Sequence, residues 1–385
     1  MYPELKVWFE EFCGLRQDIH AHPEVGFEVH RTSDIVAELL TRYGYHVTRN
    51  IGKTGVVAQL KSGNGTRSIG IRADMDALPL QEMGERPYKS TVEGKAHACG
   101  HDGNTTMLLA AARLIAHRKN FSGTLNLIFQ PAEEGQGGAH AMLEDGLLER
   151  FPCDYLFAAH SIPNAEGNKL YYCKPGPVLA SSDRFTITIK GRGGHGAEPQ
   201  NTIDPVVTGS AVVQALQSIV ARNIHPKDRV VVTVASFIAG GEGSYNIIPE
   251  TAKLLLSVRT TDPQARDITV SNIRRIAGDV CRAYGATADI THQALAAAVL
   301  NDEHAATLAR TAAISVFGED MCPVSYQPLM NSEDFSELSS LVPSAYCFLN
   351  NGNTPGCHNP AYDFNDELIM HGARYWTALT ELYLK

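Results

Sequence analysis

A short segment of the chain gathers several side chains that can bind a metal ion or transfer a proton. Residues 97–103 read His-Ala-Cys-Gly-His-Asp-Gly, which places two imidazoles, a thiol and a carboxylate close together. Such side chains suit ions like Zn²⁺ and Mn²⁺. A packed cysteine or a solvated histidine is nevertheless the commoner role of these residues, and Cys99 and His101 lack the paired spacing of structural zinc sites. The rest of the chain must decide between a metal site and ordinary packing.

A second candidate for chemistry is the adjacent pair Glu133 and Glu134, which lies between an apolar run and the glycine-rich residues 135–138. Adjacent glutamates are usually solvated. Metal-assisted hydrolysis, however, needs one carboxylate to hold the ion and another to take a proton from water. The pair can supply both functions if it lies in a cleft.

A third pattern, Gly-Arg-Gly-Gly-His-Gly at residues 191–196, matches the glycine spacing of dinucleotide-binding loops. A binding loop of that kind opens directly into a helix and has an acid about 20 residues further on. Here Pro199 and the turn residues up to Asp204 separate the glycines from any helix, and no such acid follows. We therefore expect no nucleotide site and interpret His195 as a mobile polar contact on a glycine loop.

The elements around the first two candidates predict an α/β sheet. Hydrophobic spacing predicts helices over 4–20 and 32–43, and short apolar runs predict strands at 56–60, 68–72 and 124–129, with a helix over 105–117 before the last of them. Strands that alternate with crossover helices are typical of an α/β fold. We expect the segment around His101 to lie in the loop that leads into this helix.

Polar residues follow several of these strands. Asp74 and Asp76 come just after the strand that ends near residue 72, the two glutamates come after residue 129, and His160 follows an apolar run over 154–159. In open α/β sheets, ligands bind beyond the carboxyl ends of the strands. The sequence therefore predicts that these side chains meet at one edge of the sheet.

Residues 183–293 predict a separate inserted domain. The run 185–190 alternates as a half-exposed strand, and Asp204-Pro205 is a typical helix start. Further strands are predicted at 230–234, 252–258 and 287–293, with a second helix over 263–284. This order describes an α+β domain with a four-stranded antiparallel sheet and two helices. A helix over 302–317, a strand over 345–349 and a helix from 365 return to the first domain, which we place at 1–182 and 294–385.

Size and composition agree with a two-domain globular protein. The chain has 385 residues, 44% of them hydrophobic, and a net charge of −9 without a dense run of Lys or Arg, so nucleic acid is not an expected partner. Acids interrupt the first residues, where a signal peptide would be apolar, and no run reaches 18 apolar residues. We expect a cytoplasmic protein without membrane association. The eight scattered cysteines show no disulfide framework.

Four motifs then carry a resemblance to a known family. They are Arg-Ala-Asp-Met-Asp-Ala-Leu-Pro at 72–79, the segment 97–103, Pro-Ala-Glu-Glu at 131–134 and Ser-Glu-Asp-Phe at 332–335. Together they resemble the aminoacylase and carboxypeptidase family of dinuclear metallohydrolases, in particular its hippurate hydrolases and indoleacetyl-amino acid hydrolases. The resemblance implies a zinc-peptidase-like catalytic domain with a mixed sheet flanked by helices, and a lid domain at 183–293 that carries the dimer contact.

The resemblance also implies roles for individual residues. Glu133 is the expected general base, and His195 is the expected lid histidine that contacts the oxyanion, from the partner subunit. Asn246 and Arg259 resemble the lid groups that hold the substrate carboxylate, and Asp74 and Asp76 are expected to support the ligands from behind. The metal ligands that it implies are Cys99, His101, Glu134, His160 and His358.

We therefore expect a metal-dependent amidohydrolase that splits N-acyl or N-aroyl amino acids into a carboxylic acid and a free amino acid. Its cofactors would be divalent ions, two per subunit and either Mn²⁺ or Zn²⁺, and it would form a homodimer or a higher oligomer. Asn104, Asn331 and Cys357 depart from the pattern of this branch, and Asn331 and Cys357 leave the acyl specificity open. The alternatives are a dipeptidase or carboxypeptidase of the same mechanism, a hydrolase with Cys99 as nucleophile, and a metal-binding protein without catalysis.

Overall fold

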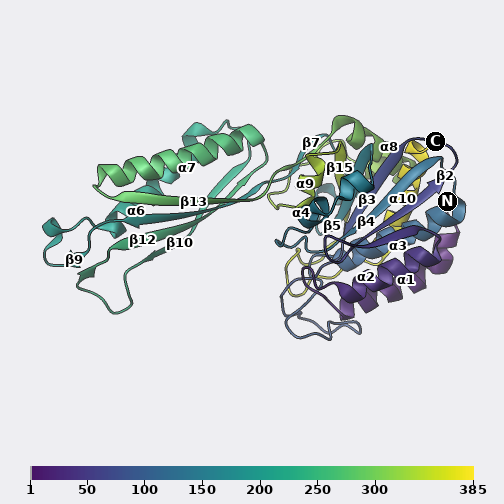
Figure 1. Cartoon of the computed structure of the whole chain (residues 1–385), viewed down its shortest axis with the longest axis horizontal. Helices are drawn as coiled ribbons and strands as arrows, with labels where there is room; N and C mark the ends of the chain where they lie inside the picture. The colour runs from purple at the N-terminus through teal and green to yellow at the C-terminus, as the bar shows by residue number, and fades with distance from the viewer. Residues whose placement is uncertain (1) are drawn as a thin grey trace. The chain divides into compact units, whose positions relative to one another are not determined.

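The structure is a computed structural model that describes residues 2–385, and the chain divides into two compact units. The first unit comprises the residues up to 176, residues 300–327 and residues 334–385, and it contains both ends of the chain (Figure 1). The second comprises residues 177–299 and 328–333. Segment 328–333 therefore belongs to the second unit, although it lies far along the chain from the rest of it.

A seven-stranded mixed sheet forms the centre of the first unit, with the order β1-β2-β4-β3-β5-β15-β6. Its strands are β1 (His46–Ile51), β2 (Gly55–Ser62), β3 (Ser68–Asp74), β4 (Gly123–Gln130), β5 (Tyr155–Ile162), β6 (Tyr171–Tyr172) and β15 (Ser344–Asn350). Strands β4, β3, β5 and β15 run parallel to one another, and the outer strands pair antiparallel. The predicted mixed sheet is confirmed, and the carboxyl ends of its parallel strands share one edge.

Helix α3 is the central helix of the first unit, because it packs against α10, α1 and α2 as well as against β3 and β5. Most of its side chains are buried in the core that it shares with these elements. The helices of this unit are α1 (Glu4–Ala21), α2 (His30–Arg42), α3 (His101–Arg118), α4 (Gly138–Glu144), α5 (Leu147–Arg150), α8 (Glu303–Phe317), α9 (Phe335–Ser339) and α10 (Glu367–Tyr383). The first turn of α3 carries part of the segment 97–103.

Two boundaries differ from the sequence prediction and change the local setting of site residues. His101 is the first residue of α3, whereas the prediction placed it in a loop before a helix start at residue 105. Gly100 makes the earlier start possible: it has a φ of +92°, and a Cβ there would approach the Tyr362 hydroxyl oxygen to 2.5 Å. His160 lies within β5 and not after it, because this buried strand continues to Ile162.

The second unit is a four-stranded antiparallel sheet with two helices, as predicted. The sheet order is β10-β12-β8-β13, and α7 lies along β13 (Figure 1). Exposed and buried side chains alternate along β12, so one face packs against the helices. The elements are β8 (Ser182–Lys190), β10 (Val230–Ala239), β12 (Thr251–Thr260), β13 (Thr287–Ala296), α6 (Pro205–Leu216), α7 (Pro263–Ala283), the short strands β9 (Gly194–His195) and β11 (Ile247–Ile248), and a π-helical turn η3 (Ile219–Asn223).

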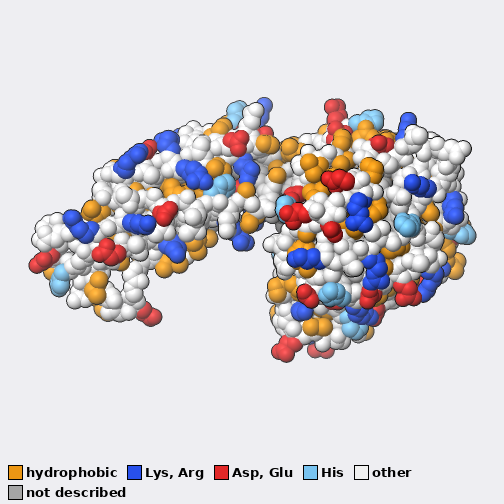
Figure 2. All heavy atoms as spheres, in the orientation of Figure 1, with side chains coloured by type: hydrophobic (Ala, Val, Ile, Leu, Met, Phe, Trp, Pro, Cys, Tyr) orange, Lys and Arg blue, Asp and Glu red, His pale blue; other side chains and the backbone are white. Residues whose placement is uncertain are grey.

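The remaining elements are short: β7 (Gly176–Leu179), β14 (Val299–Asn301), and the 3₁₀ turns η1 (Glu166–Asn168), η2 (Pro199–Asn201) and η4 (Glu319–Met321). Over residues 2–385, no helix combines the length and apolar character that crossing a bilayer requires. Basic and acidic side chains are interspersed on the visible face of each unit (Figure 2).

Candidate active site

Six side chains of the first unit converge in overlapping groups. Within each group, the ligand atoms all lie within 4.8 Å of one another. The groups are Cys99 with His101 and His160, Cys99 with Glu134 and His358, and His101 with Glu133 and Glu134. The structure therefore brings together all five residues that the family resemblance implies as metal ligands, together with the implied base Glu133.

Two of the imidazoles are oriented by backbone carbonyls. Nδ1 of His101 lies 2.8 Å from the carbonyl oxygen of Asp76, and Nδ1 of His160 lies 2.7 Å from that of Ser161. A carbonyl can only accept, so each Nδ1 carries a hydrogen and each Nε2 is the ring nitrogen left to bind an ion. Nε2 of His101 is buried and, among the described residues, has no hydrogen-bond partner. This is the arrangement expected of an imidazole prepared for a metal ion.

The two glutamates sit on a strained turn that Asp76 holds. The oxygens of Asp76 accept hydrogen bonds from the backbone N–H groups of Glu133 and Glu134, over 3.0 and 3.1 Å. Ala132, just before them, has a φ of +56°, a conformation that costs a non-glycine residue about 1–3 kcal/mol. Strain of this kind persists where surrounding contacts impose it, and here it fixes the direction of both glutamates. Asp76 thus acts on the site through the backbone.

The carboxylates differ in their surroundings. Oε1 of Glu134 lies 3.2 Å from Nε2 of the half-exposed His358. Burial raises the pKa of Glu134, but the contact with His358 and the charge on His101 outweigh it, so the net pKa is lowered and the group is ionised at neutral pH. Oε2 of Glu133 lies 4.0 Å from Nε2 of His101. Glu134 is thus engaged at the centre of the cluster, and Glu133 flanks it.

Cys357 is a second thiol beside the cluster. The N–H of His358 donates to the carbonyl of Ala98 over 2.7 Å and sets the two loops next to each other, and Sγ of Cys357 lies 4.0 Å from the carbonyl oxygen of Cys99. The contact with Cys357, together with burial, raises the pKa of Cys99 well above that of an ordinary thiol. The same contact lowers the pKa of Cys357 to about 6. Without a metal ion, Cys99 therefore remains protonated.

A buried network of hydrogen bonds and ion pairs at the ends of β3 and β4 lies next to the cluster. Asp74 pairs with Arg72 over 2.7 Å, accepts a hydrogen bond from Asn104 over 2.8 Å, and lies 3.8 Å from Nε2 of His101. Burial opposes ionisation of Asp74, but the charges of His101 and Arg72 hold its pKa below the usual range. Arg72 and Gln130 both also bind Asp334. Sequence reasoning quoted Arg72 and Asp334 within motifs but gave them no function.

The other candidate residues lie in the second unit. His195 is exposed on β9, where it pairs with Ile247 of β11, and the N–H of Gly196 donates to the carbonyl of Asn246 over 2.8 Å. The structure therefore brings His195 and Asn246 to neighbouring positions. Arg259 lies on another strand, β12, and its Nη1 donates to the Ser332 hydroxyl over 2.7 Å.

Comparison with known proteins assigns the family. Residues 70–382 match the sequence model of peptidase family M20/M25/M40. This chain belongs to that family. Hippurate hydrolase from Campylobacter jejuni is 45% identical over the full length of both chains. IAA-amino acid hydrolase ILR1-like 4 from Arabidopsis thaliana is 36% identical, and the match covers 98% of this chain and 86% of the relative.

A solved structure of the same family shares the fold. The YXEP protein of Bacillus subtilis, described as a dinuclear metal binding peptidase, is 30% identical with a TM-score of 0.85, and the match covers 98% of this chain and 99% of that one. The family resemblance predicted from four short motifs is thereby confirmed.

Proposed function

We propose that this protein is a metal-dependent amidohydrolase that cleaves N-acyl or N-aroyl amino acids, of the hippurate type, into a carboxylic acid and a free amino acid. The observation that carries this proposal is the cluster itself: five side chains of ligand type and a flanking carboxylate meet in one unit. A full-length relative that is 45% identical is a hippurate hydrolase, which supports this substrate class.

The donor set fits two divalent ions, either Mn²⁺ or Zn²⁺. Cys99 is shared by two groups of ligand atoms, one with His101 and His160 and the other with Glu134 and His358. A mixture of imidazole, carboxylate and thiolate suits these ions, and the sulfur favours zinc. Nε2 of His101 is buried and has no hydrogen-bond partner within residues 2–385, which agrees with this assignment. When bound, the ions would polarise the amide carbonyl and make a nearby water more acidic.

Glu133 carries the proton transfer in this proposal. Its carboxylate takes a proton from the attacking water and delivers it to the leaving amine nitrogen, which keeps the proton balance of amide hydrolysis closed. Asp76 contributes by fixing the backbone of Glu133 and Glu134. The orientation of the base then costs little entropy during the reaction.

The second unit supplies the substrate contacts in this proposal. The neighbouring His195 and Asn246 are assigned to the oxyanion and the substrate carboxylate, and the guanidinium of Arg259 is assigned to the same carboxylate. Support for these roles comes from the family resemblance, with His195 acting from a partner subunit. The homodimer through residues 183–293 and the cytoplasmic location stay predictions from the sequence.

A dipeptidase or carboxypeptidase with the same mechanism is the alternative, favoured by the description of the Bacillus subtilis structure as a peptidase. The two functions differ in the group on the acyl side, because a dipeptide has a free ammonium there and an N-acyl amino acid does not. Rates on N-benzoylglycine, N-acetyl amino acids and unblocked dipeptides separate them. We expect kcat/KM for the best N-acyl substrate to exceed that for any dipeptide by at least about tenfold, roughly 1.4 kcal/mol of transition-state discrimination. The reverse order would contradict the proposal.

A further inference from the structure

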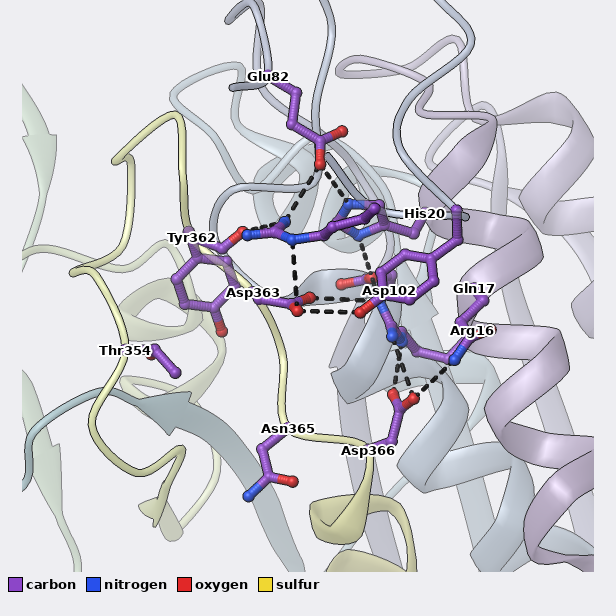
Figure 3. A network of polar contacts seen from close by, with 12 residues as sticks. Arg16, Gln17, His20, Glu82, Asp102, Thr354, Tyr362, Asp363, Asn365 and Asp366 are labelled. Carbon is purple, nitrogen blue, oxygen red and sulfur yellow. Dashed lines mark hydrogen bonds and ion pairs between the residues drawn. The ribbon is translucent and has the colours of Figure 1, made fainter. Parts of the chain in front are cut away.

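A buried arginine of α1 lies at the centre of a network of charged side chains. The Arg16 side chain is fully buried, and it binds Asp366 through Nε over 2.7 Å and through Nη2 over 3.1 Å. Its Nη1 lies 3.5 Å from Asp102, and the guanidinium stacks over the ring of Tyr88 at 4.4 Å. Figure 3 shows Arg16 and Gln17 both reaching Asp366 from α1.

One end of the network holds the segment of His101. Asp102 directly follows His101 in the first turn of α3, and its Oδ2 accepts a hydrogen bond from Nδ1 of His20 over 2.8 Å. Nε2 of His20 lies 3.3 Å from Glu82 (Figure 3). Arg16 and His20 on α1 therefore both bind the side chain that follows His101.

The other end holds the segment that follows His358. Asp366 lies at the start of α10, and Arg16 Nη1 is also 3.8 Å from Asp363. Arg86, which pairs with Glu82 over 3.1 Å, donates to the carbonyls of residues 361 and 362 over 2.7 and 2.6 Å. The loop from His358 to α10 is thus held by the same network that holds the start of α3.

The energetics of buried ion pairs indicate that this network orients its members more than it stabilises the fold. Desolvating an ion costs several kcal/mol, and well-packed apolar residues of similar volume are often at least as stabilising as a buried ion pair. What an arginine provides is the planar fork that binds a carboxylate at two points and fixes its direction. Arg16 uses that fork on Asp366 and its remaining nitrogen towards Asp102.

We propose that Arg16 is a positioning residue of the metal centre, which sets the place of His358 relative to His101 by joining the segments that follow each of them. The inference rests on the proposed function, because it takes both histidines as metal ligands. It assigns Arg16 no contact with substrate or with the reacting atoms.

The test is metal binding by the metal-free full-length protein, without any activity measurement. Zn²⁺ is titrated in competition with a chromophoric chelator, which gives the stepwise dissociation constants. Arg16→Lys keeps the positive charge but loses the planar guanidinium. Asp366→Asn removes the carboxylate that this guanidinium binds, and it serves as the test variant if Arg16→Lys does not fold. The matched control is Arg118→Lys, which makes the same change on a core helix, at an arginine that pairs with Glu381 over 2.9 Å.

We expect Arg16→Lys and Asp366→Asn to weaken at least one Zn²⁺ dissociation constant about 10- to 100-fold, the range found when a group behind a metal ligand is removed. Arg118→Lys should bind Zn²⁺ within twofold of wild type. If Arg16→Lys and Asp366→Asn also bind within twofold of wild type, the inference is wrong. A wild-type protein that binds neither Zn²⁺ nor Mn²⁺ would instead overturn the proposed function, so the two failures are distinguishable.

A double-variant cycle separates positioning from general stabilisation. If Arg16 acts through His358, then Arg16→Lys has nothing left to position once His358→Ala is present, and it should change Zn²⁺ affinity by less than about twofold in that background. A purely structural contribution would instead be additive. An undiminished effect of Arg16→Lys in the His358→Ala protein would overturn the inference.

Discussion

The buried His20 predicts a specific loss of stability at alkaline pH. Burial lowers its pKa, but the hydrogen bond and charge of Asp102, with Glu82 on the other nitrogen, outweigh burial and raise the pKa to about 9. An unfolded histidine has a pKa near 6.5. A group whose pKa is raised on folding contributes stability that is complete below the unfolded value and is lost as the pH rises through the folded one.

The size of the loss follows from these two values. The difference between about 9 and 6.5 corresponds to about 3 kcal/mol, since one pKa unit equals about 1.4 kcal/mol. The side chain of His20 is only 1% exposed, so solvent screening reduces this figure little. The free energy of unfolding should therefore fall by about 3 kcal/mol between pH 6.5 and pH 9 on account of this one residue.

Urea unfolding in the presence of a chelator measures this loss. Both tryptophans, Trp8 and Trp376, lie in the first unit, so their fluorescence reports its unfolding. His20→Asn removes the titrating group, and Glu82→Gln, which should shift the loss to lower pH, serves if the asparagine variant does not fold. His46→Asn, at an exposed position, is the control and should follow wild type. The reasoning is refuted if wild type and His20→Asn lose stability in parallel over this range.

Three further predictions concern the cluster itself. Glu133→Gln should retain its metal ions and lower kcat on N-benzoylglycine about 10²- to 10⁴-fold; a rate near wild type would remove Glu133 as the base. Cys99→Ala should retain fewer ions after gel filtration, and an unchanged metal content by elemental analysis would remove Cys99 from the ligand set. The Asp76 carboxylate accepts hydrogen bonds from the backbone N–H groups of Glu133 and Glu134. In Asp76→Asn, the side-chain NH₂ group would face one of these two N–H groups and could not accept its hydrogen bond. This substitution should lower kcat about tenfold or more, and unchanged kinetics would show that the turn keeps its shape without Asp76.

Much of the fold could be predicted from local patterns. The helix start at Asp204-Pro205 is seen as expected, with Asp204 accepting hydrogen bonds from the N–H groups of Val206 and Val207. The convergence of residues after β3 and β4 followed from the topology of parallel strands. By contrast, a strand buried on both faces has no alternating pattern to mark its end, which is why His160 was placed after β5 and not within it.

The buried networks could not be predicted from the sequence. An arginine on an amphipathic helix is normally solvated, and nothing local shows that Arg16 is buried against Asp366, far along the chain. The recruitment of residues 328–333 to the second unit likewise depends on long-range contacts. His358 had no strand end or helix pattern to indicate a ligand, and only the family resemblance pointed to it.

The most direct test of the central claim is hydrolysis of N-benzoylglycine by the chelator-stripped protein, before and after addition of Zn²⁺ or Mn²⁺. The account predicts that activity disappears on stripping and returns with about two ions per chain. Activity that is indifferent to stripping would contradict the metal-dependent mechanism and would make Cys99 a candidate nucleophile instead of a ligand.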